Sequence, residues 1–191
     1  YSSNFSLLSQ LNHGNCPCLF YYSDENGIVV YPFVRRLINS LSFFGDKELY
    51  WDTISFEYSN PHLVADNDNK RLLVLAFQNA FHKWCLGNNI VCEYVRFHPL
   101  FDDYKYFSDA KKVKDVIYID LEKPEDEIFA SFNKQCRKAV RNAEKRGVKA
   151  RFSKNRDDIL GFWKLYKDTM LRHSASESYF LRPSFFQHIL N

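Results

Sequence analysis

Apolar and polar positions along the chain predict mainly strands in its first part and mainly helices in its last part. Residues 18–22 and 28–34 are apolar runs rich in Tyr, Val and Ile, and Asn26-Gly27 lies between them. Because Asn-Gly between two such runs favours a tight turn, this pattern predicts an antiparallel hairpin. Four further strands are predicted over residues 49–55, 90–97, 113–121 and 148–152.

Four helices are predicted where apolar side chains recur every three or four residues. The first spans residues 68–86, and Gly87 is placed to end it. Its predicted inward side comprises Leu72, Leu75, Ala76, Asn79 and residues 81–83.

The second predicted helix begins at Pro124 and ends before Gly147. Its inward side comprises Phe129, Phe132, Cys136, Ala139, Val140 and Ala143, and we expect residues 129–143 to pack on the sheet. The third helix follows a cap at Asn155 and Asp157, with an inward side made of Ile159, Phe162, Trp163, Tyr166 and Met170. The fourth starts after Pro183.

This order of elements predicts a mixed α/β fold, in the α+β manner with a mixed sheet. The break nearest to a domain boundary is Gly147, which divides the chain into a first unit, 1–147, and a second unit, 148–191. One strand and two helices are too few to bury a core. We therefore expect the second unit to be incomplete and the chain to continue past Asn191.

Composition excludes several classes of protein. A hydrophobic content of 46% and an aromatic content of 17% can build a sizeable core, which argues against disorder. No apolar run approaches the length of a membrane span, and the N-terminus lacks a signal-peptide pattern. An odd count of five cysteines without such a signal favours a reducing compartment, so we expect a cytoplasmic protein.

The cysteines and histidines do not predict a metal site. Cys16-Pro17-Cys18 has no second pair at zinc-finger spacing, and the six histidines are scattered along the chain. Buried free cysteines are the more frequent finding.

The main charge feature is the segment 132–151, which holds eight Lys and Arg and one acid, Glu144. Because the whole chain is +3 and this segment is +7, the other residues sum to −4. A solvated face backing an apolar stripe and a surface for phosphate-rich ligands both explain the pattern. A DNA-reading helix is disfavoured, because no helix-turn-helix, zipper or finger pattern surrounds it.

Four stretches together resemble a known family. They are IDLEKPEDEIFASFNKQCRKAVRNAEKRGVKARF, GFWKLYKDTMLRHSASESYFLRPSFFQHIL, EYVRFHP and DTISFEYSNP. They are similar to FemABX-type transferases, the peptidoglycan-bridge aminoacyltransferases related to the GNAT acyltransferases. The resemblance covers nearly the whole chain, and its motifs are diffuse.

This resemblance implies two GNAT-like units in tandem. Residues 60–67, before the first unit's main helix, lack the Gln/Arg-x-x-Gly-x-Gly/Ala pattern that cradles the pyrophosphate of coenzyme A. We therefore expect the first unit to help hold the acceptor, a nucleotide- or lipid-linked muropeptide, and not acyl-CoA.

The resemblance also implies site residues. Arg182 in Phe-Leu-Arg-Pro corresponds to an arginine that contacts phosphate of the acceptor, and Phe186 replaces a tyrosine found in some relatives. Arg96 and His98 stand in the strand motif that reads Arg-Phe-Asp-Pro in the family, where the Asp has been a catalytic candidate. Tyr58, in the loop 57–60, lies where acceptor contacts are expected.

Four basic side chains of the 132–151 segment are candidates for steering an anionic ligand: Lys134, Arg137, Lys138 and Arg141. His98 is the one candidate catalytic base, and an ordinary structural histidine is the competing interpretation.

The predicted function is transfer of an acyl or aminoacyl group to an amine of a phosphate-bearing glycan or muropeptide precursor. Acyl-CoA and aminoacyl-tRNA both remain possible as the donor co-substrate, with no permanently bound cofactor and no DNA partner. The alternative is a non-catalytic module that binds anionic glycans or nucleic acid through the basic face of residues 134–151.

Overall fold

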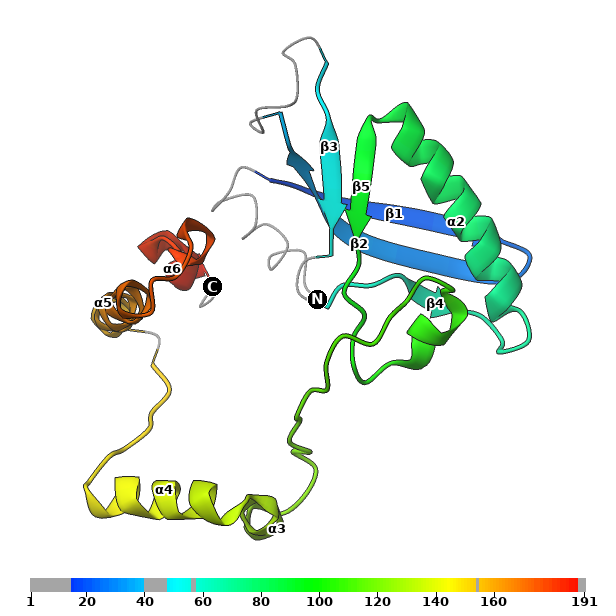
Figure 1. The fold of residues 1–191 in the computed structure, drawn as a ribbon. Coiled ribbons are helices and arrows are strands. Elements are labelled where there is room, and N and C mark those ends of the chain that lie inside the picture. Colours follow the sequence, from blue (N-terminus) through cyan, green and yellow to red (C-terminus); the bar gives the residue numbers. More distant parts are fainter. Residues whose placement is uncertain (1–14, 40–47, 56–57, 154, 189–191) are drawn as a thin grey trace.

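The computed structural model describes residues 15–39, 48–55, 58–153 and 155–188, and Figure 1 shows their arrangement. A five-stranded mixed sheet with one long helix against it makes up the first part of the chain. Its strands are β1 (Cys16–Asp24), β2 (Gly27–Leu37), β3 (Trp51–Ile54), β4 (His62–Val64) and β5 (Ile90–Tyr94). The predicted mixed α/β class with a mixed sheet is thus confirmed.

The predicted hairpin is confirmed as β1 and β2, which pair antiparallel over the whole length of β1. Its turn is closed by the Asp24 carboxylate, which accepts from the Asn26 N–H at 2.8 Å. Gly27 has a φ of +144°, and a Cβ there would lie 2.5 Å from the Val64 carbonyl oxygen. A glycine is therefore required at this turn by both backbone conformation and space.

β2 is long enough to hold two further strands on its other edge. β3 pairs antiparallel with its C-terminal half and β4 with its N-terminal half. The sequence did not predict β4, because three residues are too few to display an alternation of apolar and polar positions.

A parallel crossover completes the sheet and creates the edge at which the candidate site lies. From β3 the chain runs through β4 and helix α2 (Lys70–Gly87) to β5, which pairs parallel with β3. The carboxyl ends of β3 and β5 therefore leave the sheet side by side, as in parallel units generally.

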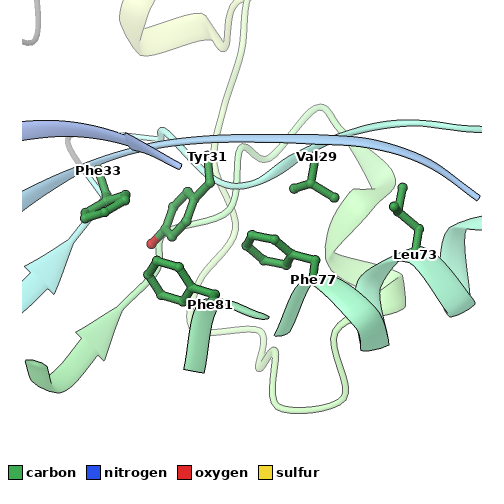
Figure 2. Close-up of a cluster of buried hydrophobic side chains, with 6 residues drawn as sticks. All are labelled: Val29, Tyr31, Phe33, Leu73, Phe77 and Phe81. Carbon is green, nitrogen blue, oxygen red and sulfur yellow. The ribbon is translucent and has the colours of Figure 1, made fainter. Parts of the chain in front are cut away.

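The core lies between β2 and α2, as Figure 2 shows. Alternate residues of β2 point to one face of the sheet, and residues four apart on α2 point back at them. The cluster consists of Val29, Tyr31, Phe33, Leu73, Phe77 and Phe81. Rings of Phe77 and Phe81 stack at 5.8 Å between centroids, and Tyr31 meets Phe81 edge-on at 5.3 Å.

The predicted inward side of this helix was wrong in most positions. Leu72 and Leu75 are 57% and 53% exposed, whereas Leu73 and Phe77 are buried, and of the predicted set Phe81 is in the core. Apolar residues occur on two sides of the helix, so periodicity alone did not separate them. The aromatic side packs inward because large rings bury the most surface against β2.

Two predicted strands and one predicted helix were wrong in the second half of the chain. Residues 113–121 and 148–152 are in no strand of the sheet. The helix predicted from Pro124 is two helices, α3 (Glu125–Ser131) and α4 (Lys134–Lys145). The break occurs because Asn133 caps α4, its side chain accepting from the Cys136 N–H at 2.8 Å.

The predicted packing of residues 129–143 on the sheet is also wrong. No residue of α3 or α4 is buried, and both helices lie away from the sheet in Figure 1. Gly147 does follow the helix as predicted, with a φ of +74°. Val148 N–H donates to the Ala143 carbonyl at 3.0 Å and Gly147 N–H to Glu144 at 2.9 Å, which is a Schellman end.

The last helices agree with the sequence. α5 (Arg156–Arg172) is capped by Asn155, which accepts from the Asp157 N–H at 2.9 Å, and α6 is Pro183–His188. α5 packs on α6, and the Trp163 indole N–H donates to the Leu181 carbonyl at 3.0 Å. Of the predicted inward residues of α5, Phe162 and Tyr166 contact Phe186 of α6, and none of the predicted residues is buried. Two short 3₁₀ turns, η1 (Asp102–Tyr106) and η2 (Glu177–Tyr179), lie in the connections.

Candidate functional site

The candidate site lies where the chain leaves the carboxyl ends of β3 and β5. Ser55 continues the pairing past β3, its N–H donating to the Tyr94 carbonyl at 2.9 Å. Its hydroxyl oxygen accepts from the Arg96 N–H at 2.6 Å, and Ser55 is 5% exposed. These two bonds hold the two departing segments next to each other.

A buried asparagine fixes the next residues of both segments. Asn60 is 1% exposed, and its Oδ1 accepts from the His98 N–H at 3.0 Å. Its Nδ2 donates to the Pro61 carbonyl at 2.8 Å. Since both ends of the amide are bound, the loop after β3 and the loop after β5 are joined at a defined spacing.

Three residues predicted from the sequence meet on this frame. The Tyr58 ring lies 5.7 Å from the Arg96 guanidinium carbon and 5.8 Å from the His98 ring, which it meets edge-on. Arg96 is exposed, and Tyr58 and His98 are half-buried. We call Tyr58, Arg96 and His98 the edge cluster. Residue 57 of the same loop lies outside the described residues.

The hydrogen bonding of His98 determines what its ring offers to a ligand. Nδ1 accepts from the Leu100 N–H at 3.2 Å. A neutral imidazole with an accepting Nδ1 carries its proton on Nε2. Nε2 is therefore a hydrogen-bond donor in the neutral ring, which suits an anionic or carbonyl oxygen better than a proton to be abstracted.

A second histidine adjoins the edge cluster and was missed in the sequence. Phe101 packs on His98 at 4.5 Å between centroids and on His62, from β4, at 6.1 Å. Burial lowers the pKa of His62, the charge of Asp103 opposes this shift, and His98 adds to it. His62 had no motif around it, and Ser55 and Asn60 were signalled only by their position in the loop after a strand.

Arg182 and Phe186 lie on a different part of the structure. Phe186 packs against Phe162 and Tyr166, each at 5.3 Å between centroids, and Arg182 is exposed next to the start of α6. No hydrogen bond, ion pair or ring contact between described residues joins them to the edge cluster. The structure therefore does not bring together all of the site residues that the resemblance implied.

The four basic candidates of α4 divide into two kinds. Arg137 donates to the Ala130 carbonyl at 2.8 Å and to the Phe132 carbonyl, and the Arg141 guanidinium carbon lies 5.4 Å from the Phe129 ring centre. Both therefore tie α4 to α3. Lys134 and Lys138 are exposed and make no described hydrogen bond or ion pair, so they are the two free to meet an anion.

A hollow of about 490 Å³ lies at the β1–β2 turn, away from the edge cluster. Its lining includes three carboxylates, those of Asp24, Glu25 and Asp66. This charge repels phosphate, so the hollow does not suit a phosphate-bearing acceptor.

The described ranges contain neither a metal-binding cluster nor a helix that could cross a membrane. No three His, Cys, Asp or Glu side chains among those residues gather closely enough to hold a metal ion. Burial, followed by the charge of Cys16, raises the pKa of Cys18 to about 11, which disfavours the thiolate that binds metals. The described part of the chain contains no helix that is both long and apolar enough to cross a bilayer.

Comparison with known proteins gives one match. Residues 102–187 match the model of the FemAB family, which confirms over that segment the family resemblance seen in the sequence. The segment runs from η1 into α6 and carries Arg182, Phe186 and the basic helix α4, whereas the edge cluster precedes it. No curated protein and no solved structure matches the chain.

Proposed function

From the premise that residues 102–187 belong to the FemAB family, we propose that the chain serves an acyl- or aminoacyl-transfer reaction. The acceptor is an amine on a phosphate-bearing glycan or muropeptide precursor used in cell-envelope biogenesis. The donor is acyl-CoA or aminoacyl-tRNA, and we place the reaction in the cytoplasm, where both donors are made.

The observation that carries this proposal beyond the family match is the edge cluster. Arg96 presents a guanidinium, which fits phosphate oxygens, and His98 presents an Nε2–H. The Tyr58 ring between them provides an apolar face with a hydroxyl at its end, which suits a sugar. The three groups together suit a phosphate-bearing sugar better than a purely apolar ligand.

The chemistry that follows needs no covalent enzyme intermediate. A neutral amine attacks the thioester or ester carbonyl of the donor, whose oxygen becomes negative. The amide C–N bond forms, the C–S or C–O bond breaks, and the proton that the nitrogen loses passes to the leaving thiolate or tRNA oxygen. The protein contributes by holding the amine near the carbonyl and by donating hydrogen bonds to the developing oxyanion. In this scheme the edge cluster positions the acceptor, with His98 as a donor and not as the base.

Two arginines are candidate phosphate ligands: Arg96 in the edge cluster and Arg182 next to the start of α6. We expect Arg96→Ala and Arg182→Ala each to weaken binding of a nucleotide-linked muropeptide about tenfold or more in calorimetry, because each removes a charged donor from phosphate. Arg71→Ala, which removes an exposed arginine from α2, is the matched control and should leave the affinity unchanged.

The outcomes separate the two arginines and the two classes of function. A loss in one variant alone assigns the phosphate to that arginine, and unchanged affinity in both overturns the proposed acceptor. Consumption of acyl-CoA or charged tRNA by the protein with bound acceptor establishes an enzyme. Tight acceptor binding without consumption of either donor would instead establish the binding module.

A further inference from the structure

Two consecutive arginines of β2 meet different partners on the neighbouring strand β3. Arg36 lies opposite Asp52, and its guanidinium donates to both carboxylate oxygens, at 2.9 Å from Nε and 2.5 Å from Nη2. Arg35 lies opposite Thr53, and its side chain has neither an ion pair nor a hydrogen bond to a described residue. The charge of Arg36 is therefore neutralised within the sheet, whereas the charge of Arg35 is not.

Arg35 continues the face of β2 that packs on α2. Val29, Tyr31 and Phe33 point to this face in Figure 2, and Arg35 is the next residue of the same alternation. Its Nε is buried without a hydrogen-bond partner, and so is the hydroxyl of Thr53, which is 1% exposed. Buried polar groups are nearly always paired, because an unpaired one does not recover the free energy lost on leaving water.

The groups around the Arg35 guanidinium offer it no negative charge. Its Cζ lies 4.3 Å from the ring centre of Trp51, so the indole covers one face of the planar group. Cys16 lies opposite Arg35 on β1. Burial, followed by the charge of Cys16, raises the pKa of Cys18 to about 11 and outweighs the opposing charge of Arg35. The Cys18 thiol therefore keeps its proton at neutral pH and does not act as a counter-ion.

The acid in the same cross-strand row is directed at another group. Arg35, Thr53 and Glu93 follow one another across β2, β3 and β5, which places Glu93 on the far side of Thr53. Burial raises the pKa of the Glu93 carboxyl, and the Tyr31 hydroxyl is the group that opposes this shift. The guanidinium of Arg35 and the hydroxyl of Thr53 are thus two neighbouring donors without an acceptor.

We propose that Arg35 and Thr53 bind a small carboxylate ligand. The carboxylate accepts from the guanidinium in the plane of that group and from the Thr53 hydroxyl, while Trp51 covers one guanidinium face. Binding neutralises the charge of Arg35 and gives both unpaired donors an acceptor. The site lies toward the amino end of β3, whereas the edge cluster follows its carboxyl end, and it does not depend on the proposed transfer reaction.

Charge and shape favour a carboxylate over a phosphate. Arg35 supplies one positive charge, which one carboxylate neutralises. A phosphate group carries about 1.5 to 2 negative charges at neutral pH, so it would leave excess charge in a half-buried site beside Trp51. A planar carboxylate also matches the guanidinium edge, which is the approach that remains when the indole covers a face.

The test uses acetate as the probe and the whole chain as the protein. Sodium chloride replaces acetate at constant ionic strength, so that general screening does not change. We expect about 100 mM acetate to raise Tm by about 3 °C relative to chloride, because a ligand of the folded state stabilises it by mass action. Acetate should also shift the Nε–H resonance of Arg35 in ¹⁵N NMR, whereas phosphate at equal ionic strength should do neither.

Two variants separate the roles of charge and hydrogen bonding. Arg35→Lys keeps the charge and removes the planar fork, and Thr53→Val keeps the shape and removes the hydroxyl. Each should weaken the acetate affinity about fivefold or more, since each loses a hydrogen bond to an anion. Arg71→Lys makes the same exchange at an exposed arginine of α2 and should leave the acetate affinity unchanged.

The wild-type titration decides the proposal even where a variant fails to fold. A wild-type chain whose Tm and Nε–H resonance are the same in acetate and chloride overturns the site. A response to phosphate as large as the response to acetate overturns the carboxylate as its ligand. An acetate response that is unchanged in both Arg35→Lys and Thr53→Val assigns the anion to another part of the chain.

Discussion

At the scale of single residues, two short polar side chains hold the candidate site together. The Ser55 hydroxyl and the Asn60 amide each accept a backbone N–H from the segment after β5. Neither side chain is long enough to reach a ligand from its buried position. They place Arg96 and His98 beside Tyr58. The edge cluster therefore depends on these two buried hydrogen bonds.

The depressed pKa of His62 makes stability depend on pH. Burial keeps the folded ring neutral, so between the folded pKa and the ordinary value near 6.5 the unfolded chain binds the extra proton. The free energy of unfolding should therefore be fully retained above pH 6.5 and fall as the pH drops below it. Urea unfolding of the wild type and of His62→Gln between pH 5 and 8 measures this.

The His62→Gln variant should flatten that part of the curve, with Gln as a neutral side chain of similar length. His82→Gln is the matched control, because His82 is exposed on α2 and should leave the slope unchanged. A slope that survives His62→Gln would assign the titration to another group.

At the scale of elements, the hydrogen bonds of Arg137 hold the corner between α3 and α4, beside the contact of Arg141 with the Phe129 ring. Arg137 extends back from α4 and donates to the carbonyl of Ala130 near the end of α3 and to that of Phe132, the residue after this helix. Carbonyls at a helix end lack intrahelical partners, and a cation there also complements the helix dipole. Arg137 on the basic face of α4 therefore stabilises the corner with α3, besides any contact of this face with an anionic ligand.

We expect Arg137→Ala to loosen α3 without unfolding the sheet. Losing a charge-assisted bond of about 1 kcal/mol should raise amide exchange of residues 128–132 roughly fivefold. Lys138→Ala is the control, because it makes the same change to helix propensity at a side chain without a described partner. Equal exchange in the two variants, measured by mass spectrometry or NMR, would contradict the assigned role of Arg137.

At the scale of the whole molecule, buried packing is concentrated in the sheet and α2. Every described member of the buried apolar core belongs to β2, α2 or β5, whereas α3 to α5 bury no residue. The two strands predicted after residue 110 have no described partner to pair with. A pattern of apolar and polar positions predicts that a segment forms a strand if another strand lies beside it. The pattern does not show whether such a neighbour exists.

Trypsin should reveal this distribution. We expect cleavage at residues 111–114 and 145–151 at least ten times faster than at Arg71 and Lys83 within α2, because proteolysis needs locally unfolded backbone. Mass spectrometry of a time course identifies the sites. Equal rates at the two kinds of site would show that residues 111–151 are packed as firmly as the core.

The sequence by itself determined the features that depend on neighbours along the chain. The hairpin turn at Asn26-Gly27, the cap at Asn155 and the helix end at Gly147 are confirmed because each depends on a few adjacent residues. Family resemblance likewise identified Tyr58, Arg96 and His98 as candidates.

Tertiary structure alone decided which side of α2 is buried, because Leu72 and Leu73 are equally apolar and the choice depends on the rings of β2. The tertiary structure also decided that Tyr58 lies beside His98, about forty residues later in the chain. The parallel pairing of β3 and β5 brings the carboxyl ends of these two strands side by side. The tertiary structure likewise decided that residues 113–121 form no strand of the sheet, because a strand needs a partner that its own sequence does not contain.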